Sequence, residues 1–182
     1  RTKDLVDNIL HHIATAFPCR HCIVALGSTQ NTARRMFVCD NSDQVSFPVD
    51  EIDPSLLLMQ TAALGPGEIV DWPDIRAMDA TTYPLAGILS RLDAGSCLML
   101  PILSPEGCFG TFAIIATDPN AFDASHRQFI VEITNVLAIA IHHADLTEAE
   151  LAVIKGVGGA KPETVNWKTD LSGGIQRVAM KH

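Results

Sequence analysis

The chain has few basic residues and few aromatic ones. Lys and Arg total 13 against 21 Asp and Glu among 182 residues, which gives a formal net charge of −8, and aromatic residues make up 5%. Nucleic-acid binding requires a basic surface that neutralises phosphates. Because this chain is acidic and has no basic stripe, we expect no direct contact with nucleic acid.

The sequence also lacks an unbroken apolar run of the roughly 18 residues that cross a bilayer. Its N-terminus shows no charged-then-apolar signal pattern. The five cysteines are an odd number scattered along the chain, which suits reduced thiols better than a disulfide framework. We therefore expect a soluble, cytoplasmic protein without membrane contact. The start at Arg1 rather than Met suggests a piece of a longer protein.

Apolar residues are abundant enough to build one sizeable core. The hydrophobic content is 47%, and 182 residues suggest one domain with an appendage. Glycine and polar residues dominate from Gly156 onward. We expect a folded domain over residues 1–147, and over residues 148–182 a linker or tail that leads towards an effector absent from this chain.

The segment from Gly95 to Asp118 predicts the centre of the fold. Two apolar runs, Cys97 to Leu103 and Cys108 to Ala116, flank Ser104-Pro105-Glu106-Gly107. Proline and glycine stand where a tight turn favours them, so the segment predicts a hairpin. Both runs are almost uninterrupted in apolar residues, which indicates central strands covered on both faces.

Amphipathic helices are predicted at both ends of the domain. Apolar residues recur at three- and four-residue spacings from Thr2 to Phe17, and again in a long helix that Asp123 or Ser125 can cap and that runs to Ala144. Residues Thr147 to Lys155 are compatible with its extension. The apolar stripe of the long helix is wider than one contact needs, which suggests two neighbours: the sheet, and either the first helix or a second subunit.

Shorter elements fill the interval between these segments. In chain order we predict a strand at Cys22 to Leu26, a turn at Gly27 to Ala33, a partner strand at Arg35 to Asp40, a helix at Ser55 to Leu64 behind the cap Asp53-Pro54, a short edge strand at Glu68 to Asp71, an irregular stretch at Trp72 to Thr82 and a helix at Tyr83 to Leu92.

This order of elements predicts an α+β fold in which helices cover both faces of an antiparallel sheet. Three motifs follow one another: S-x-x-x-x-P-I from Ser96 to Ile102, FGTFAI from Phe109 to Ile114, and Ala121-Phe122-Asp123 before the closing helix. Together they resemble a GAF domain, the small-molecule sensory module of phosphodiesterases, histidine kinases and sigma-54-type transcriptional activators. The resemblance covers residues 2–145.

The resemblance implies a five- or six-stranded sheet with the terminal helices on one face and a ligand pocket under short helices and loops on the other. It also implies that the domain regulates an attached effector. We expect a non-catalytic domain that acts through terminal-helix packing in a homodimer and binds an unknown small-molecule ligand; its cofactor is unknown. The residues expected to line the pocket are Asp71, Trp72, Ile75, Met78, Tyr83, Leu85, Ile88, Cys97 and Met99. A filled core made of the same residues would leave a degenerate domain that serves only dimerisation.

Cysteine chemistry is the remaining alternative. Cys19-Arg20-His21-Cys22 is a C-x-x-C pattern at a helix-to-strand junction, which suits a redox pair or half of a metal site, although a second C-x-x-C is missing. A thiol or metal sensor of the redox or nitric oxide type would use Cys19, Cys22 and Cys97. Similarity to the free methionine sulfoxide reductases, GAF domains with cysteine catalysis, is poor, because Ile114-Ile115-Ala116-Thr117 replaces their acidic strand ending.

Overall fold

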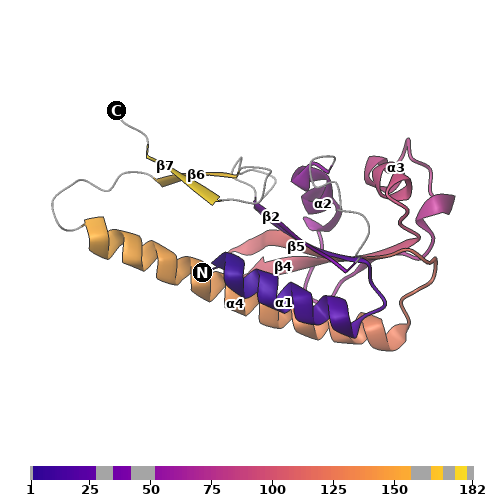
Figure 1. Ribbon diagram of the computed structural model, residues 1–182, viewed down its shortest axis with the longest axis horizontal. Coiled ribbons are helices and arrows are strands. Elements are labelled where there is room, and N and C mark those ends of the chain that lie inside the picture. The colour runs from indigo at the N-terminus through magenta and orange to yellow at the C-terminus, as the bar shows by residue number, and fades with distance from the viewer. Residues whose placement is uncertain (1, 28–34, 42–51, 157–164, 170–174, 180–182) are drawn as a thin grey trace.

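The chain builds one main sheet between two layers of helices (Figure 1). The computed structural model describes residues 2–27, 35–41, 52–156, 165–169 and 175–179. The elements are α1 (Thr2–Ala16), β1 (His21–Leu26), β2 (Arg35–Asp40), α2 (Pro54–Thr61), β3 (Val70–Trp72), the 3-10 helix η2 (Ile75–Ala77), α3 (Pro84–Arg91), β4 (Ser96–Ser104), β5 (Gly107–Ala116), α4 (Ala124–Gly156), β6 (Val165–Thr169) and β7 (Ile175–Ala179).

The main sheet has five strands in the order β2-β1-β5-β4-β3. Every neighbouring pair is antiparallel, which confirms the predicted α+β class. The predicted hairpin is β4 and β5, and β5 lies in the middle of the sheet because it pairs with both β4 and β1. Gly107 closes the turn at a φ of 127°, a conformation that favours glycine.

Both faces of the sheet are buried, as the two apolar runs predict. Successive side chains of a strand point to opposite faces, so each strand contributes to two cores. Val24, Leu100 and Phe112 face the layer of α1 and α4. Ile23, Met99 and Ala113 face the layer of α2, η2 and α3, which we call the lid. Figure 1 shows α1 and α4 along one side of the sheet and α2 and α3 on the other.

The predicted caps start two of the helices. Asp53 accepts a hydrogen bond from the Ser55 amide at 2.8 Å, with Pro54 in the first turn of α2. Asp123 accepts one from the His126 amide at 2.9 Å and so begins α4. The α4 helix continues to Gly156, which confirms the extension over 147–155.

Several elements differ from the prediction. Helix α2 ends at Thr61, before the predicted Leu64. Trp72 belongs to strand β3, because its backbone pairs with Cys97 of β4, and a 3-10 turn follows inside the stretch expected to be irregular. The tail, expected to be a linker, contains the antiparallel pair β6 and β7; apolar and polar residues alternate from Val165 to Lys168, and Gly173 and Gly174 precede β7. The predicted turn after Gly27 lies outside the described residues.

Helix α4 is apolar enough to need explanation. Over Ala124–Thr147 its mean hydropathy of 1.4 and its length would satisfy a membrane span, although a single helix of this kind is weak support for one. Three of its residues, Ile130, Leu137 and Ile141, are fully buried against α1 and the sheet. Part of the apolar character of α4 is therefore accounted for by the core.

Gly110 offers a test of the close β1–β5 approach. A Cβ at this position would lie 2.8 Å from the Ala25 carbonyl oxygen and 2.9 Å from Leu26 Cδ2. We expect Gly110→Ala to lower the free energy of unfolding in urea by about 1–3 kcal/mol, because the added Cβ would force the backbones of β1 and β5 to shift. The control is Gly65→Ala, whose added carbon would meet Glu68 at an ordinary 3.5 Å. Equal effects of the two substitutions would contradict the described packing.

Candidate functional site

Most of the residues predicted to line a pocket lie together under the lid. Five of the nine are buried members of one cluster between the sheet, η2 and α3, each at most 6% exposed: Trp72, Ile75, Leu85, Cys97 and Met99. Met78 and Ile88 are partly buried and pack against this cluster. These residues, which come from two strands and two short helices, thus lie together in one part of the core.

Tyr83 and Asp71 occupy different places. Tyr83 is 42% exposed and meets Trp72 edge-on, with ring centroids 5.9 Å apart, so it lies at the rim of the cluster. Asp71 precedes Trp72 in β3, and alternation places its side chain on the opposite face. Its carboxylate accepts a hydrogen bond at 2.7 Å from Nε of Arg127 in α4. Asp71 therefore does not lie with the other eight residues.

A buried pair of hydroxyl groups lies between α2 and β5. Oγ1 of Thr61 and Oγ1 of Thr111 are 2.6 Å apart, and Thr111 also donates to the Leu57 carbonyl at 3.3 Å. Both threonines are at most 1% exposed. The sequence patterns do not single them out, although Thr111 is the polar residue that interrupts the apolar run of β5. They give the lid side of the sheet a polar group in an otherwise apolar setting.

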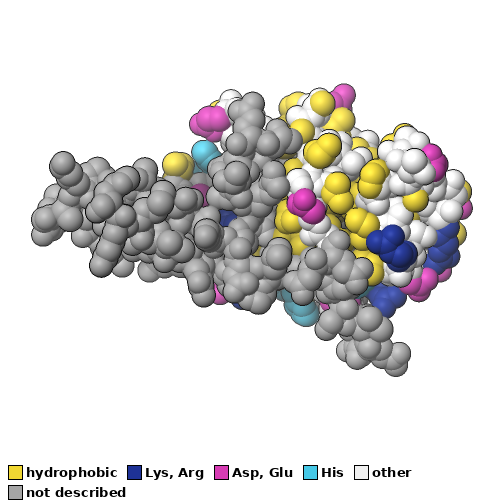
Figure 2. Space-filling model, turned by 90° about the horizontal axis from the view of Figure 1, so that it is seen from above, with side chains coloured by type: hydrophobic (Ala, Val, Ile, Leu, Met, Phe, Trp, Pro, Cys, Tyr) yellow, Lys and Arg dark blue, Asp and Glu magenta, His cyan; other side chains and the backbone are white. Residues whose placement is uncertain are grey.

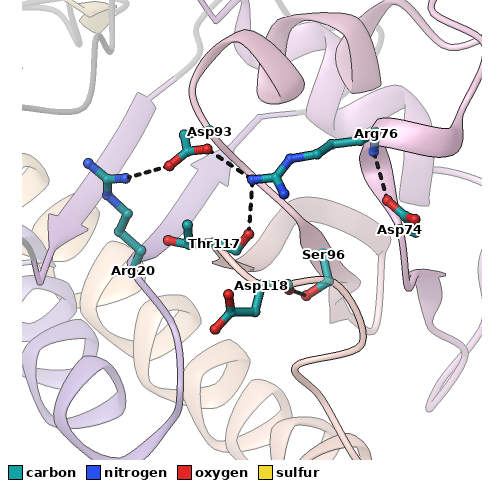
Figure 3. A network of polar contacts seen from close by, with 7 residues as sticks. All are labelled: Arg20, Asp74, Arg76, Asp93, Ser96, Thr117 and Asp118. Carbon is teal, nitrogen blue, oxygen red and sulfur yellow. Dashed lines mark hydrogen bonds and ion pairs between the residues drawn. The ribbon is translucent and has the colours of Figure 1, made fainter.

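Charged residues tie the edge of the lid to the ends of the central strands (Figure 3). Asp93 lies between two guanidinium groups, with Arg76 at 2.9 Å and Arg20 at 3.7 Å. Arg76 also donates to the Thr117 carbonyl at 3.3 Å, beyond the end of β5. Because Asp93 is well exposed, each ion pair alone contributes little stability, and their joint role is to fix the loop between α3 and β4.

The lid leaves apolar surface visible from outside. Figure 2 views the molecule from the side of α2 and α3 and shows hydrophobic side chains interspersed with polar ones over the described part of that face. Met59 of α2 is 64% exposed. The lid is thus a thin layer, with its inner residues in the core and its outer residues in contact with solvent.

The cysteines of the alternative hypothesis do not form one site. Sγ of Cys19 lies 3.4 Å from Sγ of Cys22, on the face of the sheet that α1 covers. Cys97 lies on the lid face, where burial raises the pKa of its thiol. Among the described residues, no group of three or more His, Cys, Asp or Glu side chains is placed to hold a metal ion.

His21 of the C-x-x-C segment is a buried, neutral side chain. It is 3% exposed, and Nδ1 lies 3.3 Å from a carboxylate oxygen of Asp40. Desolvation lowers the pKa of His21 to about 4, against the opposing attraction of Asp40. The effect of burial on the pKa therefore outweighs that of the Asp40 carboxylate, and the imidazole is uncharged at neutral pH.

Comparison with known proteins identifies the family. A sequence profile of the GAF domain matches residues 1–142, which is most of the chain. The chain therefore belongs to the GAF domain family, whose members are in general regulatory sensory modules. No curated protein sequence matches it.

Solved structures show the same fold at low sequence identity. GAF3 from Slr1393 of Synechocystis sp. PCC6803, in its photoproduct state, aligns with a TM-score of 0.66 at 14% identity, covering 82% of this chain and 98% of its own. A domain of a two-component sensor histidine kinase from Sinorhizobium meliloti 1021 aligns at 0.62 and 13%, covering 82% and 97%. The type II free methionine-R-sulfoxide reductase of Thermoplasma acidophilum aligns at 0.54 and 12%, covering 78% and 93%.

The buried histidine predicts a pH dependence of stability. An unfolded chain takes up a proton at His21 near pH 6.5, whereas the folded chain resists it until about 4. Stability should therefore fall as the pH drops through this window, and His21 should contribute about 2 kcal/mol of the loss by pH 5. His21→Gln should flatten the dependence measured by chemical denaturation. His11→Gln, at an exposed position of α1, is the control, and identical pH profiles for both variants would refute the assignment.

Proposed function

We propose that this domain is a non-catalytic regulatory module of a cytoplasmic signalling or transcription-regulating protein. A small molecule bound between the sheet and the lid would bias the packing of α1 and α4 within a homodimer. Membership of the GAF family supports a signalling role. The exposed apolar face of α4 is the observation that carries the mode of action.

That face has the spacing of a helix-to-helix seam. Four large apolar side chains of α4 are 47–64% exposed: Phe129, Val136, Ile139 and Leu146. Phe129 and Val136 are seven residues apart, as are Ile139 and Leu146, and three residues separate Val136 from Ile139. Spacings of seven, three and seven place these side chains at the two seam positions of a heptad, the pattern of paired helices, with Glu132 and His143 at the remaining seam positions. A second copy of α4 presents the same seam and would cover it in an isologous contact.

Apart from Phe129, whose ring stacks on Phe17 with centroids 5.3 Å apart, the seam is distinct from the part of α4 that packs in the core. Leu137 and Ile141 are fully buried in the cluster that includes α1 and the sheet. One side of α4 thus contacts the domain while the other is available to a partner subunit. A ligand under the lid can change the dimer only if the two helix arrangements differ in their affinity for it.

The positions of the thiols support a role without catalysis. Cys97 pairs with Ile115 near one end of the β4–β5 hairpin, whereas Cys108 pairs with Leu103 near the turn. Two cysteines so far apart along the hairpin cannot form a disulfide with each other. Cys97 is also fully buried, and burial raises the pKa of its thiol, so it remains a protonated, poor nucleophile at neutral pH.

A dimerisation module without a ligand is the second candidate. It is favoured by the tight burial of Trp72, Cys97 and Met99, at 6%, 0% and 0% exposure, in the volume where a ligand would sit. The buried hydroxyls of Thr61 and Thr111 favour the sensor instead, since a small-molecule site needs a few polar groups among apolar walls. The two candidates share the α4 seam and differ only under the lid.

Charge placed in the seam should dissociate the dimer. We expect Val136→Glu and Ile139→Glu, each at an exposed position, to convert a dimer into a folded monomer in light-scattering measurements, because two carboxylates would face each other across the contact. Met59→Glu is the matched control, since Met59 of α2 is as exposed as Val136, at 64% each. A monomeric wild-type protein, or equal dissociation by Met59→Glu, would contradict the seam.

Native mass spectrometry of untreated protein separates the two candidates. The sensor predicts an added mass of small-molecule size that disappears when the same sample is denatured. Thr111→Val, which removes a buried hydroxyl but preserves side-chain volume, should reduce the fraction carrying this mass. A dimer that has only the mass of its two chains would favour the dimerisation module.

A further inference from the structure

The geometry points to a reversible dithiol site at the junction of α1 and β1: we infer that Cys19 and Cys22 are oxidised to a disulfide by small hydroperoxides and reduced again by thiols. This inference concerns a part of the domain that the proposed ligand site does not use. It rests on where the two sulfur atoms lie and on what surrounds them.

The two sulfur atoms are already close to bonding distance. Their separation is 3.4 Å, and a disulfide needs about 2.05 Å, so a small movement of the segment joins them. Cys19 follows the end of α1, and Cys22 is the second residue of β1. Both side chains belong to the core cluster under α1, which means that they point to the same side of the sheet.

The two thiols are unequal, as the first step of a dithiol reaction requires. The hydrogen bond from the Cys22 thiol holds the pKa of Cys19 below its ordinary value, while the same bond together with burial raises the pKa of Cys22. Cys19 is 5% exposed and Cys22 is 0% exposed. Cys19 is therefore the thiol that ionises more readily and keeps some solvent exposure, and its small exposed fraction favours an oxidant as small as hydrogen peroxide.

The reaction balances with one peroxide per pair. The Cys19 thiolate, its proton lost to solvent, attacks one peroxide oxygen; the O–O bond breaks, and the departing hydroxide is protonated to water. The Cys22 sulfur then attacks the sulfenic acid of Cys19, forms the S–S bond, gives up its proton and displaces the oxygen as a second water. The two thiols lose two electrons, and the peroxide gains them.

The surrounding contacts place this site where it can affect the rest of the domain. Arg20, between the two cysteines, donates its amide to the Ile115 carbonyl at 2.7 Å and forms the ion pair with Asp93. On the other side, Asn41 Nδ2 donates to the Ala14 carbonyl of α1 at 3.0 Å. Closing the disulfide must displace this segment, which connects α1 to the β5 end and the lid edge (Figure 3).

A second disulfide, between two neighbouring strands, competes with the first. Cys39 of β2 is the direct cross-strand partner of Cys22, so a Cys22–Cys39 bond is the alternative outcome of oxidation. Burial raises the pKa of Cys39, which makes it the poorer nucleophile at neutral pH. The two products can be told apart by their peptides.

Peptide mapping of the full chain provides the test. Trypsin cuts after Arg20, between the two cysteines, and releases residues 4–20 and 21–34. After brief treatment with hydrogen peroxide and blocking of free thiols, most of these two peptides should run as one linked species that dithiothreitol separates. Cys39→Ser should give the same linked species, and Cys22→Ser should not. Circular dichroism confirms that each variant is folded.

Several results would overturn the inference. Linkage of 21–34 to the Cys39 peptide, residues 36–76, would assign the reactive pair to the two strands. Free thiols at Cys19 and Cys22 after peroxide treatment of the folded wild-type protein would show that the pair is structural. Oxidation of Cys19 to sulfinic acid without a linked peptide would show that Cys22 does not resolve the sulfenic acid. The wild-type result alone decides the matter if a variant fails to fold.

Discussion

The fold depends on one constraint: the β4–β5 hairpin is apolar on both faces and must be covered on both. Phe112 and Ala113 are adjacent in β5 and fully buried, yet they belong to different cores. Removing apolar surface from water is worth about 25 cal/mol per Å², so neither face can stay exposed at acceptable cost. The terminal helices cover one face, and the lid covers the other. Changes in either layer therefore reach the other mainly through the shared sheet, and at its end through contacts such as the Arg20–Asp93 ion pair.

Helix α4 extends this arrangement outward. It contacts the sheet and α1 through Leu137 and Ile141, and it leaves Val136 and Ile139 uncovered. A helix with two apolar sides in an acidic domain suits a role in which packing inside one subunit and pairing between subunits are coupled. The C-x-x-C segment joins α1 to β1. Oxidation of its two thiols would therefore alter the packing of α1. Both proposals thus have their output in the packing of α1 and α4, although the proposed ligand binds under the lid and the dithiol lies next to α1.

The sequence predicted the layers better than the site. Uninterrupted apolar runs, capping residues such as Asp53 and Asp123, and the order of three motifs were enough for the sheet, the helices and the family. Asp71 was misplaced because composition does not tell which face of a short strand a residue takes; its ion pair with Arg127 is a contact between residues 56 positions apart. The Thr61–Thr111 pair was missed for the same reason. Side-chain contacts across distant segments are set by packing, which local patterns do not encode.

The central claim is that α1, α4 and the sheet form one cooperative unit while the lid is a separate, thinner layer. Native-state amide hydrogen exchange tests this most directly, because it reports the free energy of opening for each segment. The account predicts that amides of β5, of β1 and of the buried side of α4 exchange only with global unfolding, and that α2, η2 and α3 open at lower free energy. Exchange of α4 as an independent helix, with β5 still protected, would contradict it.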